Sequence, residues 1–149
     1  MISTKSRNDE RGATLLEFAI CSTIFLTVIF TVFEFGRALW VHNALTDAAR
    51  RGARYAVIHS AADADLVKNV VVYGNPGGGT KPVVDNLTTD NNVTVTYSPQ
   101  FGVEGGSVSV SITNYQFQFL VPLVSTAIQM PSYRTTLTGE CAGLIPADL

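Results

Sequence analysis

The chain has 149 residues, of which 46% are hydrophobic and 15% are charged, and its formal net charge is −2 at pH 7. This length leaves room for one membrane helix and one small domain, and it excludes two domains of ordinary size. Beyond residue 60 the chain has seven carboxylates and three basic residues, Lys68, Lys81 and Arg134. This excess of negative charge argues against nucleic acid as a partner. The two cysteines, Cys21 and Cys141, lie far apart in the sequence and are expected to be free thiols.

The first predicted element is a membrane-spanning helix. After the polar start MISTKSRNDERG, the run Ala13–Phe33 has 21 residues and one charged side chain, that of Glu17. A helix of this length is roughly 31 Å long, which is enough to cross the apolar core of a bilayer. A cleaved secretory signal would have a core of about 7 to 15 residues and then a small-x-small site, whereas EFGRALW follows here. A buried helix of a soluble protein would rarely stay apolar for so long without a polar face.

Glu17 is the residue of this run that needs an explanation. An acid that is charged and unpaired within the span costs roughly a few kcal/mol, so an intramembrane carboxylate indicates a function and a partner. A plain membrane anchor would not need an acid at this place. The alternative is an interfacial acid at the membrane edge, whose side chain reaches the solvated headgroups. The residues alone leave both interpretations open.

Four small residues recur at every fourth position of the predicted span: Ala19, Thr23, Thr27 and Thr31. This spacing places them along one side of a helix, and ridges of small residues let helices approach closely in lipid. The threonine hydroxyls can bond to carbonyl groups of their own helix or to a partner helix. We predict helix packing through this ridge. The alternative is that the threonines are scattered filler on a surface that faces lipid.

The outer end of the span is marked by Glu34, Arg37 and Trp40. Glu34 and Arg37 are three residues apart, so they can pair on a helix, and Trp40 follows where an aromatic belt would lie. We interpret Glu34 as an ordinary acid of the membrane boundary. No proline occurs between Gly12 and Asn75, so the helix is expected to continue beyond the membrane surface.

The continuation of this helix, residues 36–60, has an apolar face of mostly small side chains. Asp47 can reach Arg50 or Arg51 on the solvated side. Alanine and glycine on the apolar face imply close contact with a sheet or another helix. The positions of the face are spaced three and four apart: Ala38, Val41, Leu45, Ala48, Gly52 and Tyr55.

After residue 60 the periodicity changes from that of a helix to that of strands. NNVTVTY and SVSVSIT alternate apolar and hydroxyl side chains, which predicts two strands joined by SPQFGVEGG as a hairpin. The apolar parity reverses between Ile112 and Tyr115, which requires a bulge or turn near Thr113 and Asn114. YRTTLTG is predicted as a further strand, and LVKNVVVY as the end of a helix that enters a strand. Three or four strands packed on the outer half of the long helix would form a small α+β head.

The sequence contains no arrangement of residues typical of catalysis, and no catalytic residue, cofactor or metal ligand is expected. GNPGGGTK has the glycines of a phosphate loop, but its lysine follows the threonine and Pro82 stands where a helix should open. His42 and His59 are 17 residues apart without a cluster of acids or cysteines, so we interpret both as surface or packing residues. NLT at Asn86 and NVT at Asn92 match glycosylation acceptors, but threonine-rich strands produce such matches by chance. We therefore expect a protein that is not an enzyme.

Two stretches of the N-terminal part match a known pattern. The polar leader ends in Gly12 and is followed by ATLLEF, in which Glu17 is the fifth and Phe18 the sixth residue after that glycine. FGRALWVHNALTDAARRGARYA, residues 35–56, has an aromatic-Gly-Arg that passes into an alanine-rich stretch. These stretches resemble type IV prepilins and pseudopilins, and within them the TadE-like proteins of tight-adherence (Flp-type) pilus systems. The resemblance implies a pilin-like α+β fold, in which a long N-terminal helix, transmembrane and then amphipathic, carries a small antiparallel sheet head.

The resemblance also implies that a membrane prepilin peptidase cuts between Gly12 and Ala13, and that Glu17 and Phe18 act in assembly. The new amine of Ala13 would lie four residues from Glu17, about 6 Å along the helix axis. A neighbouring subunit displaced by that distance would bring its amine to this carboxylate. Such a matched pair would set the register of the subunits more than it would add to their stability.

The expected organisation has four parts: a leader at 1–12, a transmembrane helix at 13–35, an amphipathic helix extension at 36–60 and an extracytoplasmic β-rich head at 61–149. The expected function is that of a minor pilin or pseudopilin in a Tad pilus or a related secretion system, located in the bacterial cytoplasmic membrane or incorporated in the pilus. The expected partners are the membrane, the prepilin peptidase, other pilin-like subunits and the pilus assembly complex. Basic residues flank both ends of the span, so the orientation with the leader inside rests on the resemblance.

Two other functions are consistent with such an anchor. In the first, the chain is an unprocessed single-pass envelope protein whose head binds another component of a secretion complex. An intact leader would distinguish it from the pilin-like protein. In the second, the head is an anchored ligand-binding or enzymatic domain, which would need a polar pocket with convergent ionisable groups.

Overall fold

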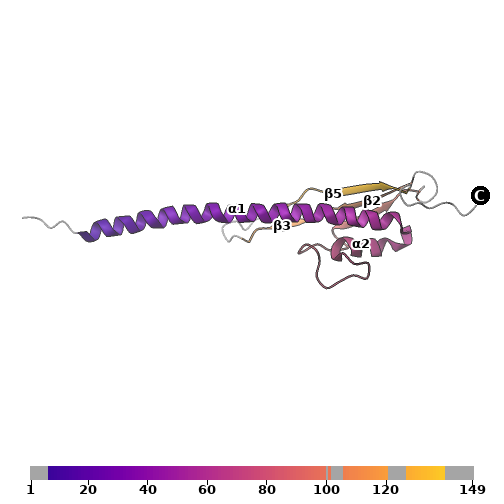
Figure 1. The fold of residues 1–149 in the computed structure, drawn as a ribbon, viewed down its shortest axis with the longest axis horizontal. Coiled ribbons are helices and arrows are strands. Elements are labelled where there is room, and N and C mark those ends of the chain that lie inside the picture. The colour runs from indigo at the N-terminus through magenta and orange to yellow at the C-terminus, as the bar shows by residue number, and fades with distance from the viewer. Residues whose placement is uncertain (1–6, 100, 102–105, 121–126, 140–149) are drawn as a thin grey trace, which may run out of the picture. The chain divides into compact units, whose positions relative to one another are not determined.

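The computed structural model of the chain describes residues 7–99, 101, 106–120 and 127–139, with side chains from residue 12 onward. The chain divides into two compact units, residues 1–37 and residues 38–149. The expected α+β fold class is confirmed, because a long N-terminal helix is followed by a small antiparallel sheet. The elements in chain order (Figure 1) are α1 Arg7–Val57, the 3-10 helix η1 Ala61–Asp63, α2 Ala64–Tyr73, β1 Val93–Tyr97, β2 Ser107–Ile112, β3 Gln116–Gln118, β4 Ala127–Gln129 and β5 Tyr133–Thr138.

The helix α1 continues over 51 residues because its sequence contains no proline to end it. Gly36 and Gly52 lie inside α1, although glycine lowers helix stability by roughly 1 kcal/mol relative to alanine. At Gly36 no atom lies within 4 Å of the place that a Cβ would take, apart from the adjoining residues and the nearby backbone of α1 itself. At Gly52 a Cβ would overlap Val71 of α2 and would lie 3.4 Å from Cγ1 of Val110 in β2. The missing side chain of Gly52 therefore allows α1 to approach both α2 and β2.

The core of the second unit forms around the part of α1 that begins at Ala38. Val71 of α2 and Val108 and Val110 of β2 are fully buried in the same cluster. Burial of each such side chain stabilises the fold by roughly 1.5–3 kcal/mol. The helical face predicted from the sequence is confirmed, with Val41, Leu45, Ala48 and Gly52 buried and with Ala38 and Tyr55 half-buried.

The main sheet has three antiparallel strands in the order β1-β2-β5. Val95 of β1 lies opposite Val110 of β2, which in turn lies opposite Thr135 of β5. The predicted pairing of the first two strands and the predicted further strand are confirmed; part of the connecting loop lies outside the described residues. Ser109 of β2 accepts a hydrogen bond from Nε of Arg134 in β5 at 2.7 Å. This bond ties the polar side chains of neighbouring strands together.

The expected break in strand parity is present as a turn after β2. The strand β2 ends at Ile112, and Asn114 has a positive φ of 57°, which asparagine tolerates better than most residues other than glycine. After the turn, Tyr115 is buried, and its hydroxyl donates a hydrogen bond to the carbonyl oxygen of Asp85 at 2.9 Å. The strand β3 then pairs with β4 in a second, two-stranded antiparallel sheet.

The segment LVKNVVVY does not enter a strand, so that prediction is wrong. The helix α2 continues through the whole segment to Tyr73. Val67, Val70 and Val71 are buried, and their spacing is that of one helical face. The helix ends at Gly74, which has a φ of 73° and donates its backbone N–H to the carbonyl oxygen of Val70 at 3.0 Å. Valine disfavours a helix only weakly, and burial in the core outweighs that preference.

Tyr97, the last residue of β1, has a buried phenol oxygen with no hydrogen-bond partner among the described residues. Burial, and to a smaller extent the nearby carboxylate of Asp63, raise the pKa of this phenol above its ordinary value of 10.0. The folded state therefore disfavours the phenolate. The stability that depends on the neutral phenol is fully present below the ordinary pKa and is lost as the pH rises through the raised one.

We expect Tyr97→Phe to leave stability at neutral pH unchanged or to raise it by about 1 kcal/mol, because it removes an unsatisfied hydroxyl. The ring contact with Phe101, at 4.9 Å between centroids, is kept. Unfolding by alkali should also begin at a higher pH. Urea unfolding followed by circular dichroism at neutral and alkaline pH measures both effects. Tyr133→Phe is the control, since it removes a hydroxyl that is bonded to His42; a loss of stability from Tyr97→Phe at neutral pH would contradict this account.

Candidate functional site

The first unit exposes its large apolar side chains. Leu15, Phe18, Phe25 and Phe33 are each 63–71% exposed. Within the described part of the chain, α1 is the one helix that is long and apolar enough to cross a membrane, by length and composition. None of its apolar window is buried within the structure. A helix whose exposed surface is mostly apolar is suited to lipid or to partner helices rather than to water.

Gly12 and Ala13 lie inside α1, close to its N-terminal end. The Gly12–Ala13 bond is thus part of a helix. Gly12 weakens the helix locally, because glycine stabilises a helix less than alanine does. Glu17 and Phe18 follow on the exposed surface of the same helix. Their side chains are therefore available to another molecule.

The ridge of small residues keeps its hydroxyl groups within its own helix. Thr23 donates a hydrogen bond to the carbonyl oxygen of Ala19, Thr27 to that of Thr23, and Thr31 to that of Thr27, each at 2.8 Å. Of the two arrangements that the sequence allows, bonding back along the helix is the one observed. Each threonine hydroxyl already donates to a carbonyl oxygen of α1, so it needs neither water nor a partner helix as an acceptor. The ridge therefore presents small side chains whose hydrogen-bond donors are satisfied.

Glu34 and Arg37 form the pair that their spacing predicts. Arg37 donates to Oε2 of Glu34 from Nη2 at 2.9 Å and from Nε at 3.3 Å. The side chain of Glu34 is only 10% exposed, which the sequence did not predict for an ordinary boundary acid. A charge-assisted pair with two donors neutralises both groups at the end of the apolar run. Trp40, at the place expected for an interfacial aromatic residue, is 59% exposed.

Comparison with protein families finds a similarity in the N-terminal part of the chain. Residues 12–54 match the family described as TadE-like protein. We call residues 12–54 the TadE-like segment after this similarity. The match confirms the resemblance that the sequence carries over these residues. No curated protein and no solved structure matches the chain.

The TadE-like segment combines two kinds of helix surface. It begins at Gly12 and includes Glu17, the ridge of small residues and the pair of Glu34 with Arg37. It ends at Arg54, and so it also includes most of the helix face that is buried in the core of the second unit. The same helix thus supplies an exposed apolar surface and part of the core of the second unit.

The two histidines bond to tyrosines. Nδ1 of His42 lies 2.8 Å from the hydroxyl of Tyr133, and the two rings meet edge to face at 5.1 Å, which joins the TadE-like segment to β5. Nδ1 of His59 donates to the carbonyl oxygen of Tyr55 at 2.8 Å and its ring stacks on the tyrosine ring at 3.8 Å. In the described ranges, no group of three His, Cys, Asp or Glu side chains is placed to hold a metal ion. Cys21 is an exposed free thiol, and Cys141 lies outside the described residues.

The sequence did not predict a polar pocket of about 680 Å3 that opens beside the TadE-like segment in the second unit. Asp47, Arg50 and Arg51 line it, although the sequence suggested that the acid pairs with one of the arginines. The available signal was the position of Arg51 next to Gly52, which belongs to the buried face. A long cationic side chain in that position must lie along the edge of the core.

Proposed function

We propose that the chain is a minor pilin-like subunit, a pseudopilin, of a Tad (Flp-type) pilus or a related secretion system. Residues 13–35 would cross the bacterial cytoplasmic membrane once, and residues 61–149 would form an extracytoplasmic head that residues 36–60 connect to the span. The observation that carries this proposal is the exposed apolar part of α1 within a TadE-like segment. Its role is to hold other subunits and the pilus assembly complex, not to catalyse a reaction.

In this proposal a prepilin peptidase removes residues 1–12 on the cytoplasmic side. Gly12 at the end of a polar leader supports the cut, and the apolar run begins directly after it at Ala13. The cut leaves a charged amine at the N-terminus of a helix. The helix dipole is positive at this end, so the amine is unfavourable there unless a carboxylate compensates its charge.

Glu17 of an adjacent subunit is the proposed partner of that amine. The two groups are four residues apart in one chain, so a displacement of about 6 Å along the helix axis brings the amine of one subunit level with the carboxylate of the next. Both groups are destabilised in an apolar surrounding when they are alone. The exposed position of Glu17 on α1 supports this role.

The ridge Ala19, Thr23, Thr27 and Thr31 is the proposed contact between neighbouring helices. Its threonine donors are satisfied inside the helix, so a second helix can approach without leaving a donor unbonded. Close approach of small residues increases van der Waals contact, which drives helix association in lipid. The ridge would then pack the helices of neighbouring subunits together, and Glu17 would set the register between those subunits.

Mass spectrometry of the chain extracted from membranes tests the processing step. We expect the mature chain to start at Ala13, and Gly12→Leu to retain the leader because a bulky side chain hinders entry of the backbone into the peptidase. Gly36→Ala is the control and should be processed as the native chain is. A native chain that retains its leader would contradict the proposal and would favour an unprocessed anchored envelope protein instead.

A further inference from the structure

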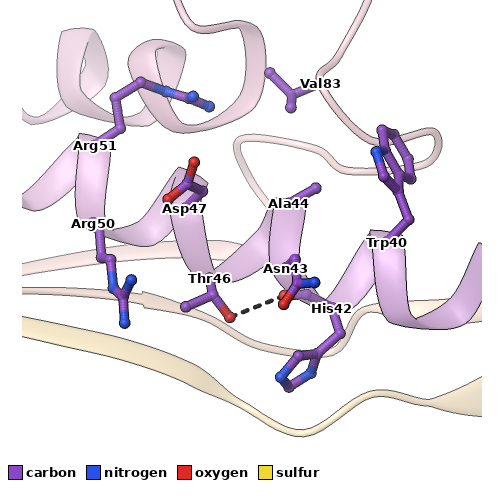
Figure 2. Close-up of a pocket in the computed structure, with 9 residues that line it drawn as sticks. All are labelled: Trp40, His42, Asn43, Ala44, Thr46, Asp47, Arg50, Arg51 and Val83. Carbon is purple, nitrogen blue, oxygen red and sulfur yellow. Dashed lines mark hydrogen bonds between the residues drawn. The ribbon is translucent and has the colours of Figure 1, made fainter.

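The polar pocket of the second unit combines ionisable and apolar side chains. Arg50, Arg51 and Asp47 line it from α1, together with Trp40, and Val83 contributes from the segment that follows α2 (Figure 2). The volume of about 680 Å3 is in the range of sites that hold a small molecule or an amino-acid side chain. All these residues belong to one compact unit.

Arg51 is the member of the pocket whose hydrogen bonding is incomplete. Its Nε and Nη2 atoms are both buried and have no hydrogen-bond partner in the part of the chain that the structure describes. These two nitrogens form one edge of the guanidinium plane, and their parallel N–H groups match the two oxygens of a carboxylate. Arg37 uses the same two atoms to bind Glu34. In Arg51 this edge is unused.

Asp47 does not occupy that edge, although it lies one helical turn before Arg51 and lines the same pocket. Figure 2 shows the two side chains on the same side of α1 with no bond between them; the marked bond runs from the hydroxyl of Thr46 to the carbonyl oxygen of His42, at 2.9 Å. Arg51 instead reaches toward Val83. Buried charged donors without acceptors are destabilised, so a molecule that supplies an acceptor would be favoured.

We propose that this pocket is a docking site for one carboxylate side chain, an aspartate or a glutamate, of a partner protein. Arg51 turns about its side-chain torsions until the edge formed by Nε and Nη2 faces the pocket, and it then binds both carboxylate oxygens. The proposal requires this rotation between staggered conformers, and Arg51 starts from a place in the pocket wall. This inference does not depend on cleavage of the leader or on the pairing of Glu17.

Charge and surface chemistry favour a protein carboxylate over a phosphate. Arg50 and Arg51 supply two positive charges and Asp47 supplies one negative charge, so the pocket has an excess of one positive charge. A carboxylate balances that excess, whereas the second charge of a phosphate would be repelled by Asp47. Trp40 and Val83 provide apolar surface for the side chains that flank an acidic residue in a peptide.

The position of Arg51 along the helix also argues for a protein partner over a lipid headgroup. Arg51 lies 11 residues beyond Trp40 in α1, which corresponds to about 16 Å along the helix axis. If Trp40 lies at the membrane interface, the guanidinium of Arg51 lies beyond the reach of a headgroup phosphate. The carboxylate that it binds then belongs to a partner outside the bilayer.

Nuclear magnetic resonance of the full chain in detergent micelles, with nitrogen-15-labelled arginine, tests this proposal through the Nε–H signal of Arg51. The probes are the peptide acetyl-Leu-Glu-Leu-amide, its neutral counterpart acetyl-Leu-Gln-Leu-amide and inorganic phosphate. We expect the glutamate peptide to shift the Arg51 signal to saturation. We expect the glutamine peptide and phosphate to bind at least about tenfold more weakly, because neither offers a single carboxylate to the guanidinium.

Variants of the arginines sharpen this test. Arg51→Gln removes the charge, and Arg51→Lys keeps the charge but lacks the planar edge, so each should weaken binding of the glutamate peptide by about tenfold or more. If Arg51→Gln disturbs the fold, the affinity of the Arg51→Lys variant for the glutamate peptide tests the proposal alone. Arg54→Gln is the matched control, since Arg54 is exposed and should leave the affinity unchanged. Equal affinity for the two peptides, native affinity in Arg51→Lys, or phosphate binding as tight as that of the glutamate peptide would overturn the proposal.

Discussion

Gly52→Ala is expected to destabilise the second unit by about 1–3 kcal/mol, because it forces a methyl group into a packed contact. The added Cβ would overlap Val71 of α2 and touch Val110 of β2. Both valines are fully buried, and β-branched side chains have few alternative rotamers. The three elements would have to move apart. Urea unfolding of the full chain in detergent, followed by circular dichroism, measures the loss as a lower midpoint.

Two further variants separate packing from helix propensity. Gly36→Ala makes the same chemical change in the same helix, but no side chain of another element lies within 4 Å of the new methyl group. It should leave the midpoint unchanged or raise it, since alanine favours a helix by roughly 1 kcal/mol over glycine. Val71→Ala combined with Gly52→Ala should recover part of the loss, because it removes the methyl groups that are overlapped. Equal effects of the two glycine variants, or no recovery, would contradict a close contact at Gly52.

The parts of the fold that the sequence predicted depend on local periodicity. The small-residue face of α1 was predictable because helical spacing brings Leu45, Ala48 and Gly52 to one side whatever they contact. The strands β1 and β2 were predictable in the same way, since alternation with period 2 specifies one buried face. The parity reversal before Tyr115 indicated a turn for the same reason. In each case the pattern predicts which side of the helix or strand is buried. It does not specify which element covers that side.

The parts that the sequence did not predict depend on contacts between distant residues. Val70, Val71 and Val72 are compatible with a strand or a helix, and only their burial in the core decides for the helix. The bond of His42 to Tyr133 joins residues that are 91 positions apart. Arg51 carries no local signal that its donors lack acceptors. These features follow from how the elements meet, which no short stretch of sequence specifies.

The candidate site near the start of α1 was predicted from a family resemblance and not from periodicity. The resemblance identified the TadE-like segment, and the structure places Gly12, Glu17 and Phe18 on one helix with exposed surroundings. The pairing proposed for Glu17 is between molecules, so a single chain does not contain the group that would satisfy it. Its test therefore has to measure assembly rather than folding.

Glu17→Gln is expected to reduce the number of assembled pili at least about tenfold in cells that depend on this subunit. The variant keeps the size of the side chain and removes its charge, so the amine of the neighbouring Ala13 remains unpaired in an apolar surrounding. An unpaired charge there costs roughly a few kcal/mol, and about 1.4 kcal/mol already changes an equilibrium tenfold. Electron microscopy counts the pili, and immunoblotting of membranes shows that the variant is present in the native amount.

The control for Glu17→Gln is Glu17→Asp, which keeps the charge on a side chain one methylene shorter and should retain more pili. Mass spectrometry must also find the Ala13 start in Glu17→Gln, so that the loss reflects assembly and not processing. The two interpretations of Glu17 then separate. An interfacial acid that headgroups solvate would lose little on becoming an amide, because glutamine is solvated there as well. An acid that recognises an amine would lose its partner. Pili in native number from a correctly processed Glu17→Gln variant would therefore exclude the pairing and leave α1 as an anchor alone.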